Sequence, residues 1–198
     1  MVSTTERIAA LAPMAARVAI GFALIDTPEE DHEMADLTKL ESKLSEVLGL
    51  AMAAQGATRH VAQLLDDESA ELRSRLEQMH DEARETEERC TEVAGSFNGK
   101  KTAILESARE TRDEGTQMME TYLGGEDDPL DGFEFLTMAE AGEVGHWSIV
   151  EKLNERAGNE QIGELVAWAL PIQRRHFDEV LASSLELAGD EDPDEIED

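Results

Sequence analysis

Two short turns, each lying between two long segments of helical periodicity, constrain the fold more than any other feature of the chain. Apolar residues recur every three or four positions in four segments, a spacing that lines one face of a helix. These segments are residues 29–65, 69–94, 129–157 and 160–188. Residues 66–68 separate the first two, and residues 158–159 separate the last two. Because helices joined by a short turn pack as antiparallel neighbours, the sequence predicts an all-α, antiparallel four-helix bundle.

The remaining segments extend this plan. Residues 95–128 connect the two hairpins and carry a further helix at 100–123. The apolar stretch 8–25 is interrupted by Pro13 and Arg17, so it predicts an extra N-terminal packing helix rather than a membrane span. The predicted units are the N-terminal helix 1–28, the bundle 29–189 and an acidic, disordered tail 190–198.

The charge of the chain indicates its surroundings. It has 46 acidic residues against 17 basic ones, a formal net charge of −29. Self-repulsion of this size matters less in molar salt, where the Debye length is about 3 Å, so the composition predicts the cytoplasm of a salt-in halophile. The shortage of Lys and Arg argues against binding to nucleic acid or to anionic membranes. The single cysteine, Cys90, excludes an intramolecular disulfide and any multi-cysteine zinc site.

Two carboxylates fall inside an apolar stripe of the segment 129–157. At about 100° per residue, Glu143 lies in the arc formed by Leu136, Trp147 and Val150, and Glu140 lies just beside it. Burying two such groups costs several kcal/mol unless they are paired, protonated or bound to a metal. This pair marks the candidate site.

The last helix brings two more polar residues to the same place. Gln173 and His176 lie within its apolar stripe. Counted back from the turn at 158–159, His176 is level with Glu140, and Gln173 is level with Glu143. We therefore expect these four side chains to meet.

The first hairpin contributes weaker candidates. His80 and Glu87 lie on the edge of the stripe of 69–94, and Glu77 points further outward. Gln55 lies inside the stripe of 29–65 and, counted from the turn at 66–68, is level with His80. His146, on the edge of the stripe of 129–157, is a further possible ligand or a surface residue.

The stretch 47–188 resembles the ferritin-like superfamily, and within it the YciF-like stress proteins. The resemblance is carried by Glu71-Leu72 followed by His80 and the acidic run to Glu88, by Glu140-x-x-Glu143 ahead of Trp147, and by the Leu153…Gly158 turn leading into Leu165…Leu170 and Leu181. It implies a ferritin-like bundle in which two irons are held by one Glu from each of two helices and a Glu-x-x-His from each of the other two.

That ligand set is incomplete in this chain. Glu77-x-x-His80 has the family's spacing, but Gln173-x-x-His176 carries an amide, and Gln55 occupies a position where a carboxylate is wanted. Neutral amides are poor partners for a bridged di-iron centre. The expected ligands of a single metal are His80, Glu140, Glu143 and His176, with Glu77, His146, Gln55 and Gln173 as weaker candidates. Iron, manganese and zinc all suit such donors.

Two functions follow from this reading. The first is a metal-binding protein of stress response or iron handling, with at most weak ferroxidase activity and no other catalytic residue or cofactor. The second is a metal-free structural or interaction bundle, in which the same polar residues form a hydrogen-bonded network. In the second reading, the N-terminal helix packs between the subunits of a homo-oligomer.

The composition makes a first testable prediction. We expect the free energy of unfolding to rise when KCl is increased from about 0.2 M to about 2 M, because salt screens the self-repulsion of the folded chain. Urea denaturation, which adds no ions, measures it. A free energy that is flat or falls with KCl would identify an ordinary acidic protein instead.

Overall fold

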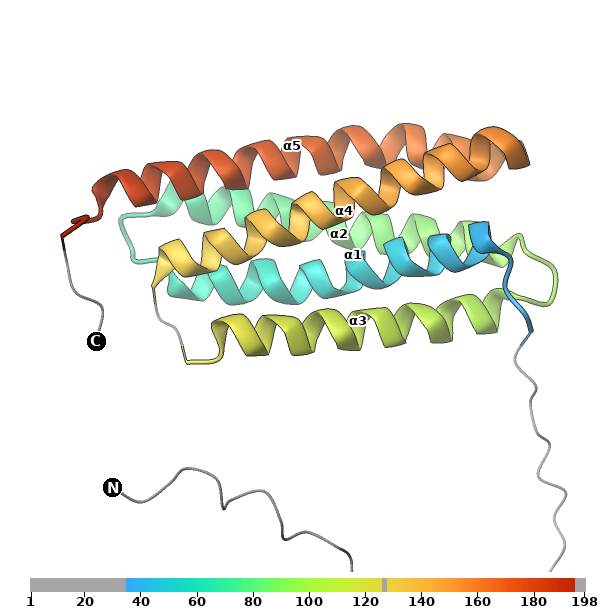
Figure 1. Ribbon diagram of the computed structural model, residues 1–198, viewed down its shortest axis with the longest axis horizontal. Helices are drawn as coiled ribbons and strands as arrows, with labels where there is room; N and C mark the ends of the chain where they lie inside the picture. The colour runs from blue at the N-terminus through green and yellow to red at the C-terminus, as the bar shows by residue number, and fades with distance from the viewer. Residues whose placement is uncertain (1–34, 126–127, 195–198) are drawn as a thin grey trace, which may run out of the picture. The chain divides into compact units, whose positions relative to one another are not determined.

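The computed structural model describes residues 35–125 and 128–194, and within these ranges the chain is helical, with no strand. The helices are α1 Lys39–Leu64, α2 Ala70–Gly95, α3 Lys101–Leu123, α4 Pro129–Ala157 and α5 Glu160–Asp190 (Figure 1). The all-α prediction is confirmed. The predicted N-terminal helix 1–28 lies outside the described residues, as do residues 195–198 of the predicted tail.

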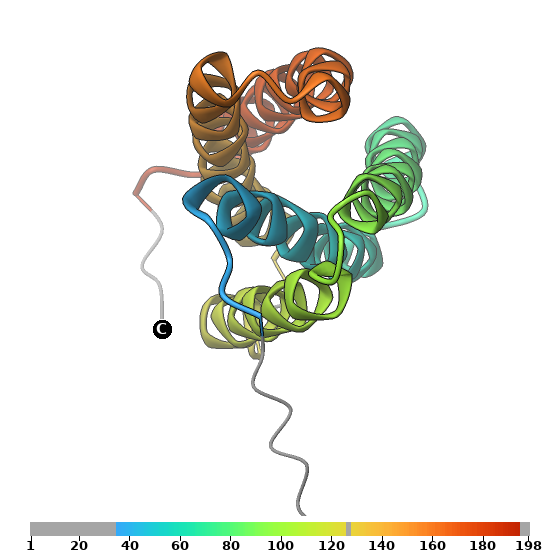
Figure 2. The same ribbon diagram turned by 90° about the vertical axis from the view of Figure 1, so that its right-hand side faces the viewer.

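Helix α1 is the central element of the described part of the chain. It packs against α2, α3 and α4, while α4 pairs with α5 and α5 also contacts α2. Viewed along the helices, α1 lies in the middle, with α3 on the side away from α5 (Figure 2). The helices α1, α2, α5 and α4 thus contact one another in a closed ring, and α3 is a fifth packed helix on α1 rather than a mere connection.

The start of α1 corrects a prediction. The segment from residue 29 was expected to be helical, but residues 35–38 are not, and α1 begins at Lys39. The reason is a capping box: the Glu41 backbone N–H donates to the Thr38 hydroxyl (3.3 Å), and the Glu41 carboxylate accepts from the Thr38 backbone N–H (2.6 Å). Thr-x-x-Glu ahead of an apolar run is the signature of such a start.

The turn between α4 and α5 is the one expected from the sequence. Gly158 adopts the left-handed conformation (φ 66°), which favours glycine at the end of a helix. The Asn159 side chain accepts a hydrogen bond from the Ile162 backbone N–H (3.0 Å) and so caps α5. A two-residue turn of this kind fixes the register of the two helices.

The apolar interior divides into two clusters at different heights. One contains Trp147, Val150 and Ile162, and the other contains Phe133 and Leu136. On α4 and α5, the buried residues between the two clusters are polar. The candidate site residues thus lie in a middle layer of the bundle, with apolar packing above and below.

Helices α1 and α3 approach closely at Gly49. A Cβ added to Gly49 would lie 2.4 Å from the Ala108 carbonyl oxygen, which is backbone and cannot move aside. At Gly56, on the same helix, an added Cβ would meet nothing within 4 Å. One glycine is therefore required by packing, and the other is not.

These two glycines predict opposite effects. Gly49→Ala is expected to destabilise the protein by about 1–3 kcal/mol, because the two helices must separate. Gly56→Ala is expected to stabilise it by about 0.5–1 kcal/mol, because alanine is the better helix former and finds open space. Urea denaturation of both variants checks this. Equal effects of the two substitutions would contradict the α1–α3 packing.

Candidate functional site

Four polar side chains from α4 and α5 are buried together in the middle layer. Glu140 is 2% exposed, Glu143 4%, Gln173 4% and His176 2%. The Gln173 amide donates hydrogen bonds to the carboxylates of Glu140 (3.3 Å) and Glu143. The His176 Nδ1 lies 3.7 Å from Glu140 Oε2. The meeting of these four residues across the turn, expected from the sequence, is confirmed.

A fifth member, Glu82 of α2, was missed by the sequence analysis. Its Oε2 lies 2.6 Å from His176 Nε2, and it also forms an ion pair with Arg175. The signal was present but weak: Glu82 lies between Met79 and Ala83, both of which face the core. We call Glu82, Glu140, Glu143, Gln173 and His176 the middle-layer cluster.

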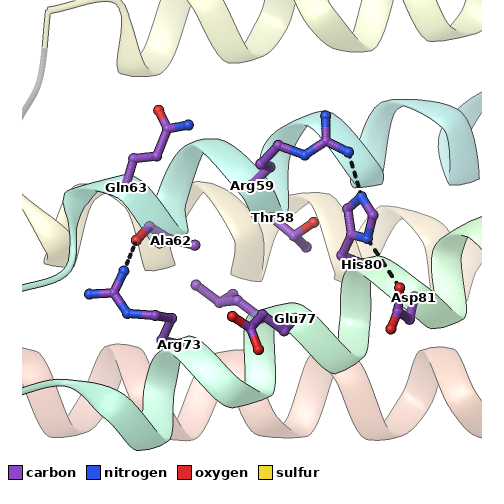
Figure 3. Close-up of a pocket in the computed structure, with 9 residues that line it drawn as sticks. Thr58, Arg59, Ala62, Gln63, Arg73, Glu77, His80 and Asp81 are labelled. Carbon is purple, nitrogen blue, oxygen red and sulfur yellow. Dashed lines mark hydrogen bonds and ion pairs between the residues drawn. The ribbon is translucent and has the colours of Figure 1, made fainter.

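His80 and Glu77 do not belong to this cluster. They line a separate pocket of about 430 Å³ between α1 and α2, shown in Figure 3. There, Arg59 of α1 reaches across to His80, with 2.6 Å between Arg59 Nη2 and His80 Nε2, and His80 Nδ1 lies 3.5 Å from Asp81. The imidazole is therefore engaged by its own neighbours on α1 and α2.

The remaining candidates also have other partners. Gln55 donates a hydrogen bond to Glu87 Oε2 (2.6 Å), and His146 Nδ1 lies 3.0 Å from Glu46 Oε2. The prediction that Gln55 and His80 lie at the same height along α1 and α2 is wrong. The connection between α1 and α2 has five residues, 65–69, and fixes the register less tightly than the two-residue turn between α4 and α5.

Burial and neighbouring charge set the protonation of the cluster. Burial, together with the charge of Glu140, raises the pKa of Glu143 well above its usual value. Burial alone would lower the pKa of His176, but its contacts with Glu140 and Glu82 outweigh this and raise it. Burial likewise opposes ionisation of Glu82, yet hydrogen bonds led by the one with His176 lower its pKa.

These directions describe a network balanced by protons. The raised pKa of Glu143 favours its neutral form, which accepts from Gln173. The raised pKa of His176 favours the charged imidazolium between the carboxyl groups of Glu82 and Glu140. Arg175 adds a second positive charge beside Glu82. The polar groups of the cluster thus satisfy one another, as buried polar groups must.

The donors fit one metal better than two. Carboxylate oxygens and an imidazole nitrogen suit Fe²⁺, Mn²⁺ or Zn²⁺. The ligand set of a two-iron centre is incomplete, because Gln55 and Gln173 stand where anionic donors are needed. His80 lies in the pocket between α1 and α2, outside the cluster. In the part of the chain that the structure describes, no three His, Cys, Asp or Glu side chains are arranged so that they could hold a metal ion as they stand. Metal binding therefore requires the side chains of the cluster to turn.

Two further features of the described residues concern Cys90 and the apolar character of the helices. Cys90 is fully buried, and burial raises the pKa of its thiol, which makes it a small core residue rather than a reactive one. Over residues 35–125 and 128–194, none of the helices has the length and apolar character needed to cross a membrane.

Comparison of the chain with protein-family models, with curated proteins and with solved structures finds no match. The resemblance to the ferritin-like superfamily rests on the sequence motifs given above, and function has to be argued from the middle-layer cluster itself.

Glu143 makes a prediction for the metal-free protein. A carboxyl group whose pKa is raised by folding contributes stability that is fully present below its unfolded pKa and is lost as pH rises through the folded pKa. Glu143→Gln keeps a carbonyl oxygen that can accept from Gln173, but it does not titrate, so the variant does not lose this stability as pH rises. We expect the variant to be more stable than wild type at about pH 8, the difference growing by about 1.4 kcal/mol per pH unit between the two pKa values.

Urea denaturation from about pH 4 to about pH 8, in the presence of a chelator, measures this difference. Glu151→Gln, at an exposed position of the same helix, controls for the change in net charge. If Glu143→Gln is the less stable protein at about pH 8, Glu143 is ionised in the folded state and the proton-balanced network is wrong.

Proposed function

We propose that this chain is a ferritin-like metal-binding protein that holds one divalent metal ion in the middle layer of its helical bundle. The observation that carries the proposal is the convergence of three carboxylates and one imidazole, from three helices, between two apolar clusters. The proposed ligands are Glu82, Glu140, Glu143 and His176. Carboxylates gathered in this way need compensating positive charge, and a bound metal ion is one source of it.

The residues around the proposed ligands position them. Gln173 donates to both Glu140 and Glu143 and so holds the two carboxylates side by side. Arg175 holds the Glu82 carboxylate beside the imidazole. Binding requires His176 and Glu143 to give up protons, so metal affinity should fall at low pH. Bound iron would supply one-electron chemistry, in keeping with the proposed role in iron handling or stress response.

The setting of this activity is proposed from composition. The excess of 29 negative charges fits the cytoplasm of a salt-in halophile, where molar KCl screens it. Assembly into a homo-oligomer belongs to the same proposal.

A second function has its own support. Every member of the middle-layer cluster has a hydrogen-bond or ion-pair partner within the cluster, so protons can supply the balancing charge. In that reading, the cluster orients α2, α4 and α5 relative to one another, and the protein is a structural or interaction module. Buried polar networks are known to specify packing in this way.

Elemental analysis distinguishes the two functions. Protein purified in high KCl is measured before and after anaerobic loading with Fe²⁺, Mn²⁺ or Zn²⁺. We expect about one metal per chain, lost in Glu143→Ala and weakened at least about tenfold in Glu82→Gln, because each removes an anionic donor.

His80→Ala is the matched control. Its imidazole pairs with Arg59 and Asp81, so metal content should not change. Two irons per chain would revive the two-iron site despite the glutamines. Absence of metal under every condition would refute the first function and leave the structural module.

A further inference from the structure

A groove of about 600 Å³ runs along α1 between α3 and α4. On α1 its lining extends from Ser42 to Ala57, about 22 Å at 1.5 Å per residue. The volume lies within the range of about 300–1,000 Å³ that is typical of small-molecule sites. The groove is therefore long enough for an extended ligand.

The ionisable side chains that line the groove are acidic apart from His146. Five glutamates line it: Glu46, Glu110, Glu114, Glu140 and Glu143. Among the described residues that line it there is no Lys or Arg. Two of the five glutamates, Glu140 and Glu143, belong to the middle-layer cluster and are almost fully buried. A cation is the complementary ligand charge.

Polarity changes along the length of the groove. At one end, the α1 residue Glu46 faces His146 of α4 (3.0 Å), close to the point where Ser45 of α1 meets Ser107 of α3 (3.0 Å). Glu110 lies one helical turn beyond Ser107 on α3. This end and the middle of the groove are acidic.

The other end is apolar. Ala57 of α1, Met119 of α3 and Phe135 of α4 line it. At the rim, Met118 is 49% exposed and Met138 41% exposed. Methionine is flexible and adapts to apolar ligands of different shapes.

Small residues keep the groove open. Gly56 and Gly142 both line it, and a Cβ added to either would meet nothing within 4 Å. A glycine inside a helix costs about 0.5–1 kcal/mol relative to alanine. At these two positions the packing within the chain does not require glycine, and the absent side chains leave room in the groove.

We propose that this groove binds an elongated, amphipathic organic cation, such as a long-chain primary amine. Its ammonium group lies at the acidic end, beside Glu110 and Glu114. Its apolar body runs along the small residues of α1 toward Met118, Met119 and Phe135. The gradient from acidic to apolar sets the direction of the ligand, and this binding does not depend on a metal in the middle-layer cluster.

Isothermal titration of the full chain, in a chelator and moderate KCl, tests this with three probes of equal chain length. These are octylammonium, octanol and octanoate. We expect octylammonium to bind with about one molecule per chain and at least about tenfold more tightly than octanol, with octanoate not binding. Spermidine, which has charge but little apolar body, should bind more weakly than octylammonium.

Variants locate the site. Gly142→Leu fills the groove and should weaken octylammonium at least about tenfold. Gly145→Leu is the matched control on the same helix, because Gly145 also has open space around it but does not line the groove. Glu110→Gln combined with Glu114→Gln should reduce the preference for octylammonium over octanol without affecting the fold. Circular dichroism confirms the folding of each variant.

Two outcomes would overturn the proposal. If octanol binds as tightly as octylammonium, the groove does not select cations. If Gly142→Leu and Gly145→Leu bind octylammonium equally well, the cation binds elsewhere on the acidic surface. Neither outcome depends on metal content, so this experiment tests the groove proposal independently of the metal-site proposal.

Discussion

The burial of charge in the middle layer governs the rest of this structure. Glu140 and Glu143 lie on the face of α4 that packs against other helices, so their carboxyl groups are removed from water. Isolated buried carboxylates are too costly to persist, and each one here has a partner. Gln173 and His176 come from α5, and Glu82 comes from α2. The requirement for these partners ties three helices together at one height and separates the apolar interior into two clusters.

The groove and the cluster are two faces of the same pair of carboxylates. Glu140 and Glu143 touch Gln173 on one side and line the groove between α3 and α4 on the other. The close approach of α1 and α3 at Gly49 keeps α3 against α1, while α3 and α4 contact each other only sparsely and leave the groove between them. An acidic interior that opens to one side is suited to cations, whether the occupant is a metal ion or an organic ammonium.

Prediction from the sequence succeeded where a short turn fixed the geometry. The two-residue turn at 158–159 sets the register of α4 and α5, so counting along the helices was enough to bring His176 level with Glu140. It failed between α1 and α2, where five residues intervene. There His80 pairs with Arg59 and Asp81, and Glu82 takes the place beside His176 that His80 was expected to hold.

The sequence by itself determined the helical class, the apolar faces and the α4–α5 hairpin, because periodicity and turn chemistry act over a few residues. Only the tertiary structure decided that α3 packs on α1, that Glu82 completes the cluster and that a groove opens beside it. Those features depend on the relative rotation and offset of helices far apart in the chain. A rotation of one helix by a single residue, about 100°, exchanges His80 for its neighbours, and local sequence does not specify it.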